Sequence, residues 1–143
     1  MDKSAIMNIL PHRDPMLVID EVDLHEGISI GKYTVRGDEF FLQGHFPGKP
    51  VVPGVILCEM MAQSSCLLVE WDGASGEKQT PYFTGLNKVK FKNTVLPGDT
   101  VIFKCELINK REPFYAIRGS GYVNEMLCVS GELSFAVVKE NGE

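Results

Sequence analysis

The sequence lacks the features that mark several large classes of protein. It has no run of eighteen apolar residues, so no membrane-spanning helix is expected. It has no basic excess, because 14 Lys and Arg stand against 19 Asp and Glu, and the net charge of −5 argues against nonspecific nucleic-acid binding. Residues 1–8 lack the basic and apolar regions of a signal peptide, which favours a cytoplasmic protein. No repeat or linker divides the 143 residues, which suit a single domain over 1–143.

The cysteines also lack a pattern. The chain has four, Cys58, Cys66, Cys105 and Cys128, and none forms a C-x-x-C pair, so zinc and thioredoxin-like sites have little support. On one helix, Cys58 and Cys66 would lie about 12 Å apart, which is too far for a disulfide. We expect all four to be reduced and to lie in or near the core.

An apolar helix over about 53–71 follows a loop rich in proline and glycine. Pro53 suits the first turn, where its missing N–H costs nothing. Apolar residues cover almost every face of the helix, which predicts burial all round. Residues 72–76 have the composition of a turn that ends it.

Strand patterns lie on both sides of this helix. A short helix over 4–10, capped by Ser4, comes first. The predicted strands cover 16–22, 28–36, 81–86 with an extension over 89–91, 101–109, 114–124 and 126–139. Alternation predicts one face on each of three strands: Ile28, Ile30, Tyr33 and Val35, with a phase change near Gly31; Val101, Phe103, Cys105 and Leu107; and Leu127, Val129, Gly131, Leu133, Phe135 and Val137. The pattern predicts an α+β domain whose antiparallel sheet of about six strands curls around one long central helix. Pairing across a sheet edge would give a dimer.

Two titratable residues mark the loop and the helix. His45 lies in the loop, and Glu59 lies inside the apolar helix, where a carboxyl is costly without a partner or a use. Each residue alone would also suit a structural role, in packing or in an ion pair. We assign His12, in a turn between two prolines, to packing or an interface, and His25 to an acidic surface segment. Cys58 adjoins Glu59 but points about 100° away on a helix, so we assign it to packing.

The motifs resemble those of a known family. Residues 44–50, 53–55 and 59–63 (GHFPGKP, PGV and EMMAQ) are similar to the signature of the 3-hydroxyacyl-acyl-carrier-protein dehydratases of the FabZ type. Residues 10–20, 83–91 and 95–99 match in the same order, so the resemblance covers roughly 8–138. It implies the hot-dog fold, dimers that often form hexamers, and an active site between two subunits. One subunit would supply the loop histidine and the other the helix glutamate, with no metal or organic cofactor.

The resemblance implies dehydration of a (3R)-3-hydroxyacyl thioester to the trans-2-enoyl thioester in bacterial fatty acid elongation. His45 matches the family's catalytic histidine and would take the proton from C2. Glu59 matches the catalytic glutamate and would protonate or orient the hydroxyl, with burial favouring its neutral form. The amide of Gly54 would stabilise the enolate oxygen. Gln63, one turn after Glu59, could bind Glu59 or the substrate.

The sequence also suggests where substrate and carrier protein bind. The acyl chain needs an apolar tunnel, and its candidate lining residues, which would equally suit the core, are Phe46, Met60, Met61, Leu86 and Val95. An acidic acyl carrier protein would dock on basic residues, for which the candidates are Lys88, Lys90, Lys92, Lys110, Arg111 and Arg118. The motifs leave open an isomerising dehydratase, an acyl-thioesterase and a non-catalytic acyl-binding protein.

Overall fold

A computed structural model describes residues 1–43, 48–71 and 78–140. Its helices are α1 (Lys3–Ile6) and α2 (Gly54–Ser64), with 3-10 turns η1 (Phe40–Leu42) and η2 (Cys66–Leu68). Its strands are β1 (Glu21–His25), β2 (Ile28–Thr34), β3 (Lys78–Phe91), β4 (Thr100–Arg111), β5 (Phe114–Val123) and β6 (Met126–Glu140). No helix in these ranges is long and apolar enough to cross a membrane.

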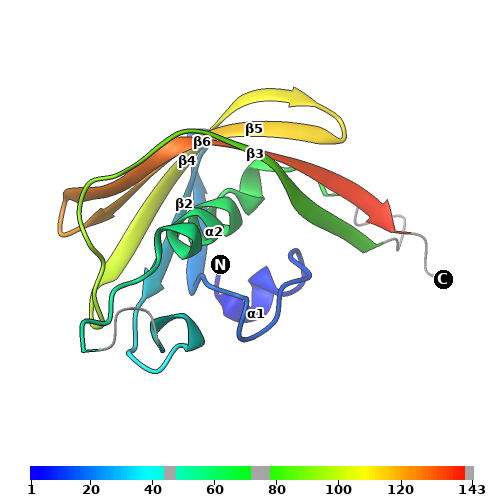
Figure 1. Ribbon diagram of the computed structural model, residues 1–143. Helices are drawn as coiled ribbons and strands as arrows, with labels where there is room; N and C mark the ends of the chain where they lie inside the picture. The colour runs from blue at the N-terminus through cyan, green and yellow to red at the C-terminus, as the bar shows by residue number, and fades with distance from the viewer. Residues whose placement is uncertain (44–47, 72–77, 141–143) are drawn as a thin grey trace.

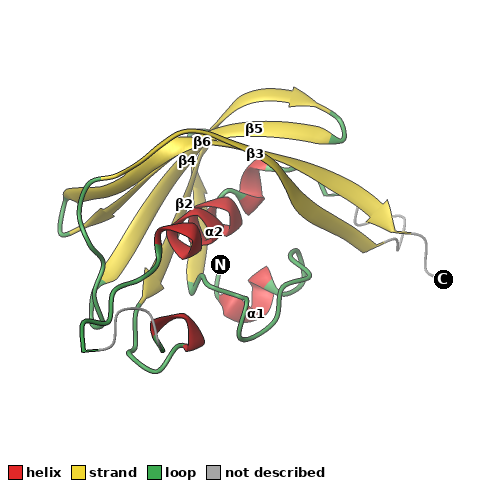
Figure 2. Cartoon of the chain, viewed as in Figure 1, coloured by secondary structure: helices red, strands yellow, loops and turns green. Residues whose placement is uncertain are grey.

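The six strands form one antiparallel sheet in the order β1-β2-β4-β5-β6-β3. The sheet curves over α2, which crosses its concave face (Figure 1). The short pieces α1 and η1 lie along the open side (Figure 2), whereas η2 follows the end of α2 and contacts β1 and β2. This is the hot-dog architecture, so the predicted fold class is confirmed.

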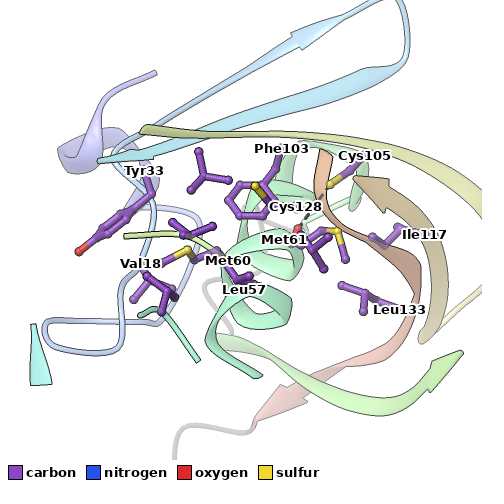
Figure 3. Close-up of a cluster of buried hydrophobic side chains, with 14 of the residues drawn as sticks. Val18, Tyr33, Leu57, Met60, Met61, Phe103, Cys105, Ile117, Cys128 and Leu133 are labelled. Atoms are coloured by element: carbon purple, nitrogen blue, oxygen red, sulfur yellow. Dashed lines mark hydrogen bonds between the residues drawn. The ribbon is translucent and has the colours of Figure 1, made fainter. Parts of the chain in front are cut away.

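The main core lies between α2 and the sheet. Met60 and Met61 of α2 are fully buried, and they face strand residues such as Phe103 and Ile117 (Figure 3). The Cys105 thiol donates to the Met61 carbonyl at 3.4 Å. All four cysteines are buried free thiols, as expected. The packed sulfur and aromatic side chains fix the helix against the sheet.

The central helix is shorter and less buried than predicted. Pro53 is its N-cap rather than its first residue, and the helix ends at Ser64, not near residue 71. The Ser64 hydroxyl donates to the Met60 carbonyl and the Ser65 hydroxyl to the Ala62 carbonyl, and such bonds weaken the last turn of a helix. Val55 is 72% exposed, so burial on every face was also wrong. The predicted turn over 72–76 lies outside the described residues.

The N-terminal predictions are only partly correct. Helix α1 is capped by Asp2, whose carboxylate accepts from the Ala5 amide, and not by Ser4. The strand predicted over 16–22 is displaced to β1, because residues 16–18 bind the central helix instead of a neighbouring strand. Residues 17–19 are buried consecutively: Leu17 and Ile19 form a second core with Ile6 of α1, whereas Val18 packs in the main core. This run of apolar residues therefore forms an extended segment that packs against the central helix, and not a strand of the sheet.

The inward face of β2 differs from the prediction over its first half. Ser29 and Gly31 point inward, whereas Ile28 is 37% exposed and Ile30 is only partly buried. The Ser29 hydroxyl donates to the Ser64 carbonyl at 2.6 Å. The end of α2 lies so close that only small residues fit beneath it. The prediction was based on side-chain polarity, but at this position side-chain size determines which residues face the helix.

Gly31→Ala is expected to lower the free energy of unfolding by about 1–3 kcal/mol, as overpacking does. A Cβ at Gly31 would lie 2.5 Å from the Ser64 Cβ and 3.0 Å from the Ser64 Cα, so the helix end would have to move. Urea unfolding measures the change. Gly85→Ala is the matched control, because a Cβ there meets only the Ser134 Cβ, at 4.0 Å. Equal effects of both substitutions would contradict the close approach.

The C-terminal half follows the predicted pattern closely. The β5–β6 turn falls at Asn124 and Glu125, both with positive φ. Along β6, residues 129, 131, 133, 135 and 137 are buried as predicted, whereas Leu127 of the same set is only partly buried, beside a register shift between β5 and β6. On β4, Leu107 is 40% exposed instead of buried, because the register shifts between Leu107 and Asn109. That irregularity turns the end of the strand away from the core.

Candidate active site

Glu59 lies in the middle of α2, on the side that faces the N-terminal segment. Its side chain is 19% exposed and lines a cavity of about 40 Å³. Most of the lining is apolar, with Leu10, Trp71 and Phe83 among the residues that form it. A carboxyl group therefore stands at an apolar cavity, where proton transfers are strongly affected by the surroundings.

Gln63 holds Glu59 from one helical turn further along. It is 2% exposed, and its Nε2 donates to Glu59 Oε1 at 2.9 Å and to the Met16 carbonyl at 2.8 Å. Its Oε1 accepts from the Val18 amide at 2.8 Å. The expected bond to Glu59 is therefore present. Both hydrogens of the Gln63 amide group are used in hydrogen bonds, so Gln63 holds the Glu59 carboxylate in one position.

His12 is the second partner of Glu59, and the sequence did not predict it. Its Nε2 lies 3.2 Å from Glu59 Oε1, and its side chain is 19% exposed. Its Nδ1 is buried and has no hydrogen-bond partner within the described ranges. The turn that carries it is tied down by Arg13, whose guanidinium donates to the carbonyls of Met7, Leu10 and His12. The sequence assigned His12 to packing or an interface, whereas in the structure its imidazole contacts the candidate acid.

The protonation of Glu59 also differs from the expectation. Burial raises the pKa of this carboxyl, but the hydrogen bonds from His12 and Gln63 and the charge of His12 outweigh it, so the pKa is lowered. The predicted neutral form was therefore wrong for this chain. At neutral pH Glu59 is a carboxylate that accepts two hydrogen bonds.

Wild-type stability is expected to fall more steeply in acid than that of Glu59→Gln. A carboxyl with a lowered folded-state pKa stabilises the fold above its unfolded pKa, near 4.5, and loses that contribution as the pH falls through the lowered value. The difference in unfolding free energy between the two proteins should therefore be largest near neutrality and shrink below about pH 4. Urea unfolding at several pH values measures it, with exposed Glu21→Gln as control. A difference that grows in acid would contradict the lowered pKa.

Gly54 begins α2 and faces a different cavity. It lines a groove of about 520 Å³ together with Val55, Phe91 and Lys92. A Cβ at Gly54 would lie 2.8 Å from the tip of the Phe91 ring, so this 53% exposed side chain would have to shift to admit a larger residue. The first amides of a helix have no carbonyl acceptor within it, which suits a negatively charged oxygen. Gly54 precedes Glu59 by five residues, which places the two about 140° apart around the helix.

Comparison with known proteins identifies the family of this chain. A family model described as a FabA-like domain matches residues 10–132. The chain belongs to the FabA-like family. A relative from Petrotoga mobilis, named 3-hydroxyacyl-[acyl-carrier-protein] dehydratase FabZ, is 39% identical over 140 residues, covering 97% of this chain and 99% of the relative. A relative of the same name from Clostridium tetani is 42% identical over 135 residues, covering 92% and 94%.

Solved structures give the same fold. The dehydratase heterocomplex ApeI:P from Xenorhabdus doucetiae superposes with a TM-score of 0.77 at 21% identity, covering 96% of this chain and 91% of that one. Cj0977 from Campylobacter jejuni superposes with a TM-score of 0.71 at 10% identity, covering 97% and 92%. At such identities the likeness shows the fold alone.

In this member of the FabA-like family, the other predicted site residues are dispersed. His45 and Phe46 lie outside the described residues. Met60 and Val95 are fully buried in the core, whereas Leu86 on β3 is 54% exposed. An acyl tunnel formed by these residues stays a prediction.

The basic candidates, Lys88, Lys90 and Lys92 as one predicted group and Lys110, Arg111 and Arg118 as another, are distributed differently in the structure. Lys88, Lys90 and Arg118 line a groove of about 460 Å³ on the face of the sheet that points away from α2, while Lys92 lines the groove beside Gly54. Arg118 lies 3.3 Å from Glu106 and 3.6 Å from Glu132, so its charge is partly neutralised. Lys110 pairs with Glu70 at 2.6 Å. Docking of a carrier protein on these residues stays a prediction. Within the described ranges, no three His, Cys, Asp or Glu side chains gather as metal ligands.

Proposed function

We propose that this chain removes water from a (3R)-3-hydroxyacyl thioester on acyl carrier protein and forms the trans-2-enoyl thioester during bacterial fatty acid elongation. Membership of the FabA-like family and relatives named 3-hydroxyacyl-[acyl-carrier-protein] dehydratase FabZ support this function. The observation that carries it is the partly buried Glu59, fixed by Gln63 at an apolar cavity. Such a carboxyl suits a substrate with an apolar chain and a hydroxyl group.

Three groups would share the chemistry. His45, outside the described residues, would take the proton from C2, which the thioester carbonyl makes acidic. The Gly54 amide would hold the carbonyl oxygen as it gains negative charge. Glu59 would orient the hydroxyl and protonate it, so that the C3–O bond breaks and water leaves. The electrons of the C2–H bond then form the double bond.

The complete site would need two chains. Within one chain, Gly54 and Glu59 line different cavities, which supports a site whose amide and carboxylate come from two chains. The outer edge of β3 has no partner strand in the described part of the chain. Phe83, Leu86 and Phe91 of this strand are 44%, 54% and 53% exposed. An apolar strand edge suits pairing with a second copy, which supports a homodimer. Assembly of such dimers to a hexamer is what the resemblance to FabZ-type dehydratases implies.

Product analysis tests the proposal. The protein is incubated with 3-hydroxyacyl carrier proteins of several chain lengths, and the products are identified by mass and by the position of the double bond. The expected product has lost one water and carries a trans-2 double bond. A 3-enoyl product would show an additional isomerisation. Release of a free acid without an enoyl product, or an unchanged substrate, would overturn the proposal.

A further inference from the structure

The proposed dehydration leaves one proton without a source. Glu59 is to protonate the hydroxyl, yet its two hydrogen-bond donors favour the carboxylate. Gln63 donates through an amide, which cannot give up a proton under these conditions. His12 is the other group in contact with Glu59 Oε1, at 3.2 Å. An imidazolium is a proton donor of ordinary strength near neutral pH.

The geometry of His12 suits such a transfer. Both side chains are 19% exposed, which reduces the screening of their interaction by water. The Nδ1 atom of His12 has no partner in the described protein, so the contact with Glu59 determines that Nε2 carries the proton. Arg13 anchors the His12 turn through three backbone carbonyls. The fixed backbone of this turn therefore keeps the imidazole of His12 in contact with Glu59.

Among the residues that the structure describes, few other ionisable groups lie near this pair. From η2, Cys66 lines the same cavity, and burial raises the pKa of its thiol to about 12, so it stays neutral. The neighbouring Cys58 thiol also has a raised pKa, from burial and from Glu59. The lining residues from β3 and β6, Pro81, Phe83 and Phe135, do not titrate. The guanidinium of Arg13 is the nearest fixed charge along the chain, and its hydrogen bonds go to backbone carbonyls.

We propose that His12 is a positioning residue that acts through Glu59, holding its carboxylate and supplying the proton that the departing hydroxyl receives. This inference rests on the proposed function. The imidazolium Nε2–H bond breaks and the proton forms a bond to Glu59, giving a neutral imidazole and a carboxylic acid. The carboxylic acid passes a proton to the hydroxyl, the C3–O bond breaks, and water leaves with that bonding pair. His12 then takes a proton from solvent, to which the proton removed from C2 returns.

The test separates proton supply from simple hydrogen bonding. His12→Gln keeps an N–H donor of similar reach but cannot supply a proton. We expect it to lower kcat by roughly 10²-fold, with KM within about twofold of the wild type. In the wild type, kcat is expected to fall at alkaline pH, where His12 and Glu59 no longer share a proton. In His12→Gln, the remaining activity is expected to lack this fall. His25→Gln, an exposed histidine on β1, is the matched control and should behave as wild type.

A second substitution and a spectroscopic measurement complete the test. His12→Ala should regain activity with added imidazole. In the ligand-free wild type, ¹⁵N NMR should show a proton on His12 Nε2 at neutral pH, and its signal should move in Glu59→Gln. This measurement needs neither turnover nor a folded His12 variant. An unprotonated Nε2 would overturn the inference.

The kinetic outcomes are also decisive. A His12→Gln variant with the wild-type kcat, or with a lowered kcat but an unchanged pH profile, would overturn proton supply by His12. A wild type that forms no enoyl product would overturn the proposed function itself. A wild type that forms it, with His12→Gln equally active, would overturn only this inference.

Discussion

Glu59→Gln is expected to lower kcat for dehydration by roughly 10²–10⁴-fold, the range that a general acid or base contributes. The glutamine side chain has a similar size and can keep the contact with Gln63, but it neither accepts nor delivers a proton. Formation of the enoyl thioester measures the rate, and circular dichroism checks the fold. A folded variant with wild-type kcat would contradict a role for Glu59 in the chemistry.

Mixing this variant with His45→Ala extends the prediction to the two-chain site. Each variant alone should be inactive, because every site lacks either the base or the carboxylate. After joint unfolding and refolding at equal amounts, about a quarter of the wild-type activity should return, since about half of the dimers are mixed and each has one complete site. The control is the double variant His45→Ala/Glu59→Gln refolded with either single variant. No recovery would contradict a site shared between chains.

Phe103→Ala is expected to lower the free energy of unfolding by about 3–5 kcal/mol, the usual cost of removing a buried aromatic ring. Phe103 is fully buried on β4 in the core beneath α2 (Figure 3). The strand beside it is already in close contact, because a Cβ at Gly121 would lie 2.8 Å from the ring. The surroundings therefore leave little freedom to refill the cavity.

Urea unfolding at one fixed protein concentration measures this loss, because assembly would otherwise change the apparent stability. Phe114→Ala is the matched control. It makes the same exchange at the start of β5, where the side chain is 51% exposed, and should cost less than about 1 kcal/mol. Equal losses in the two variants would contradict the packing around Phe103.

The sequence predicted the C-terminal strands well because their alternation reflects one plain division between core and solvent. On β6, residues 129 to 135 follow the period of two, and at Ala136 a residue of the other face becomes buried as well. The prediction was wrong where a close tertiary approach decided the outcome. Gly31 and Ser29 face inward because the end of α2 leaves room only for small side chains, and polarity does not report that distance.

The candidate site shows the same limit. Glu59 and Gln63 are four residues apart, so helical spacing alone predicted their contact. His12 precedes Glu59 by 47 residues, and no local pattern places its imidazole against the helix. The predicted direction of the Glu59 pKa shift was wrong because the contact with His12 could not be foreseen. Burial can be inferred from an apolar helix, but the donor that outweighs it comes from a distant segment.

The hydrogen bonds of Gln63 make the N-terminal segment part of one local folding unit with Glu59. Residues 16 and 18 supply a carbonyl and an amide to Gln63, and the same segment carries His12. If residues 10–18 detach from α2, Glu59 loses its histidine partner and the anchored position of its glutamine partner in a single event. Hydrogen exchange at the Val18 amide should therefore report the fraction of molecules in which the surroundings of Glu59 are intact.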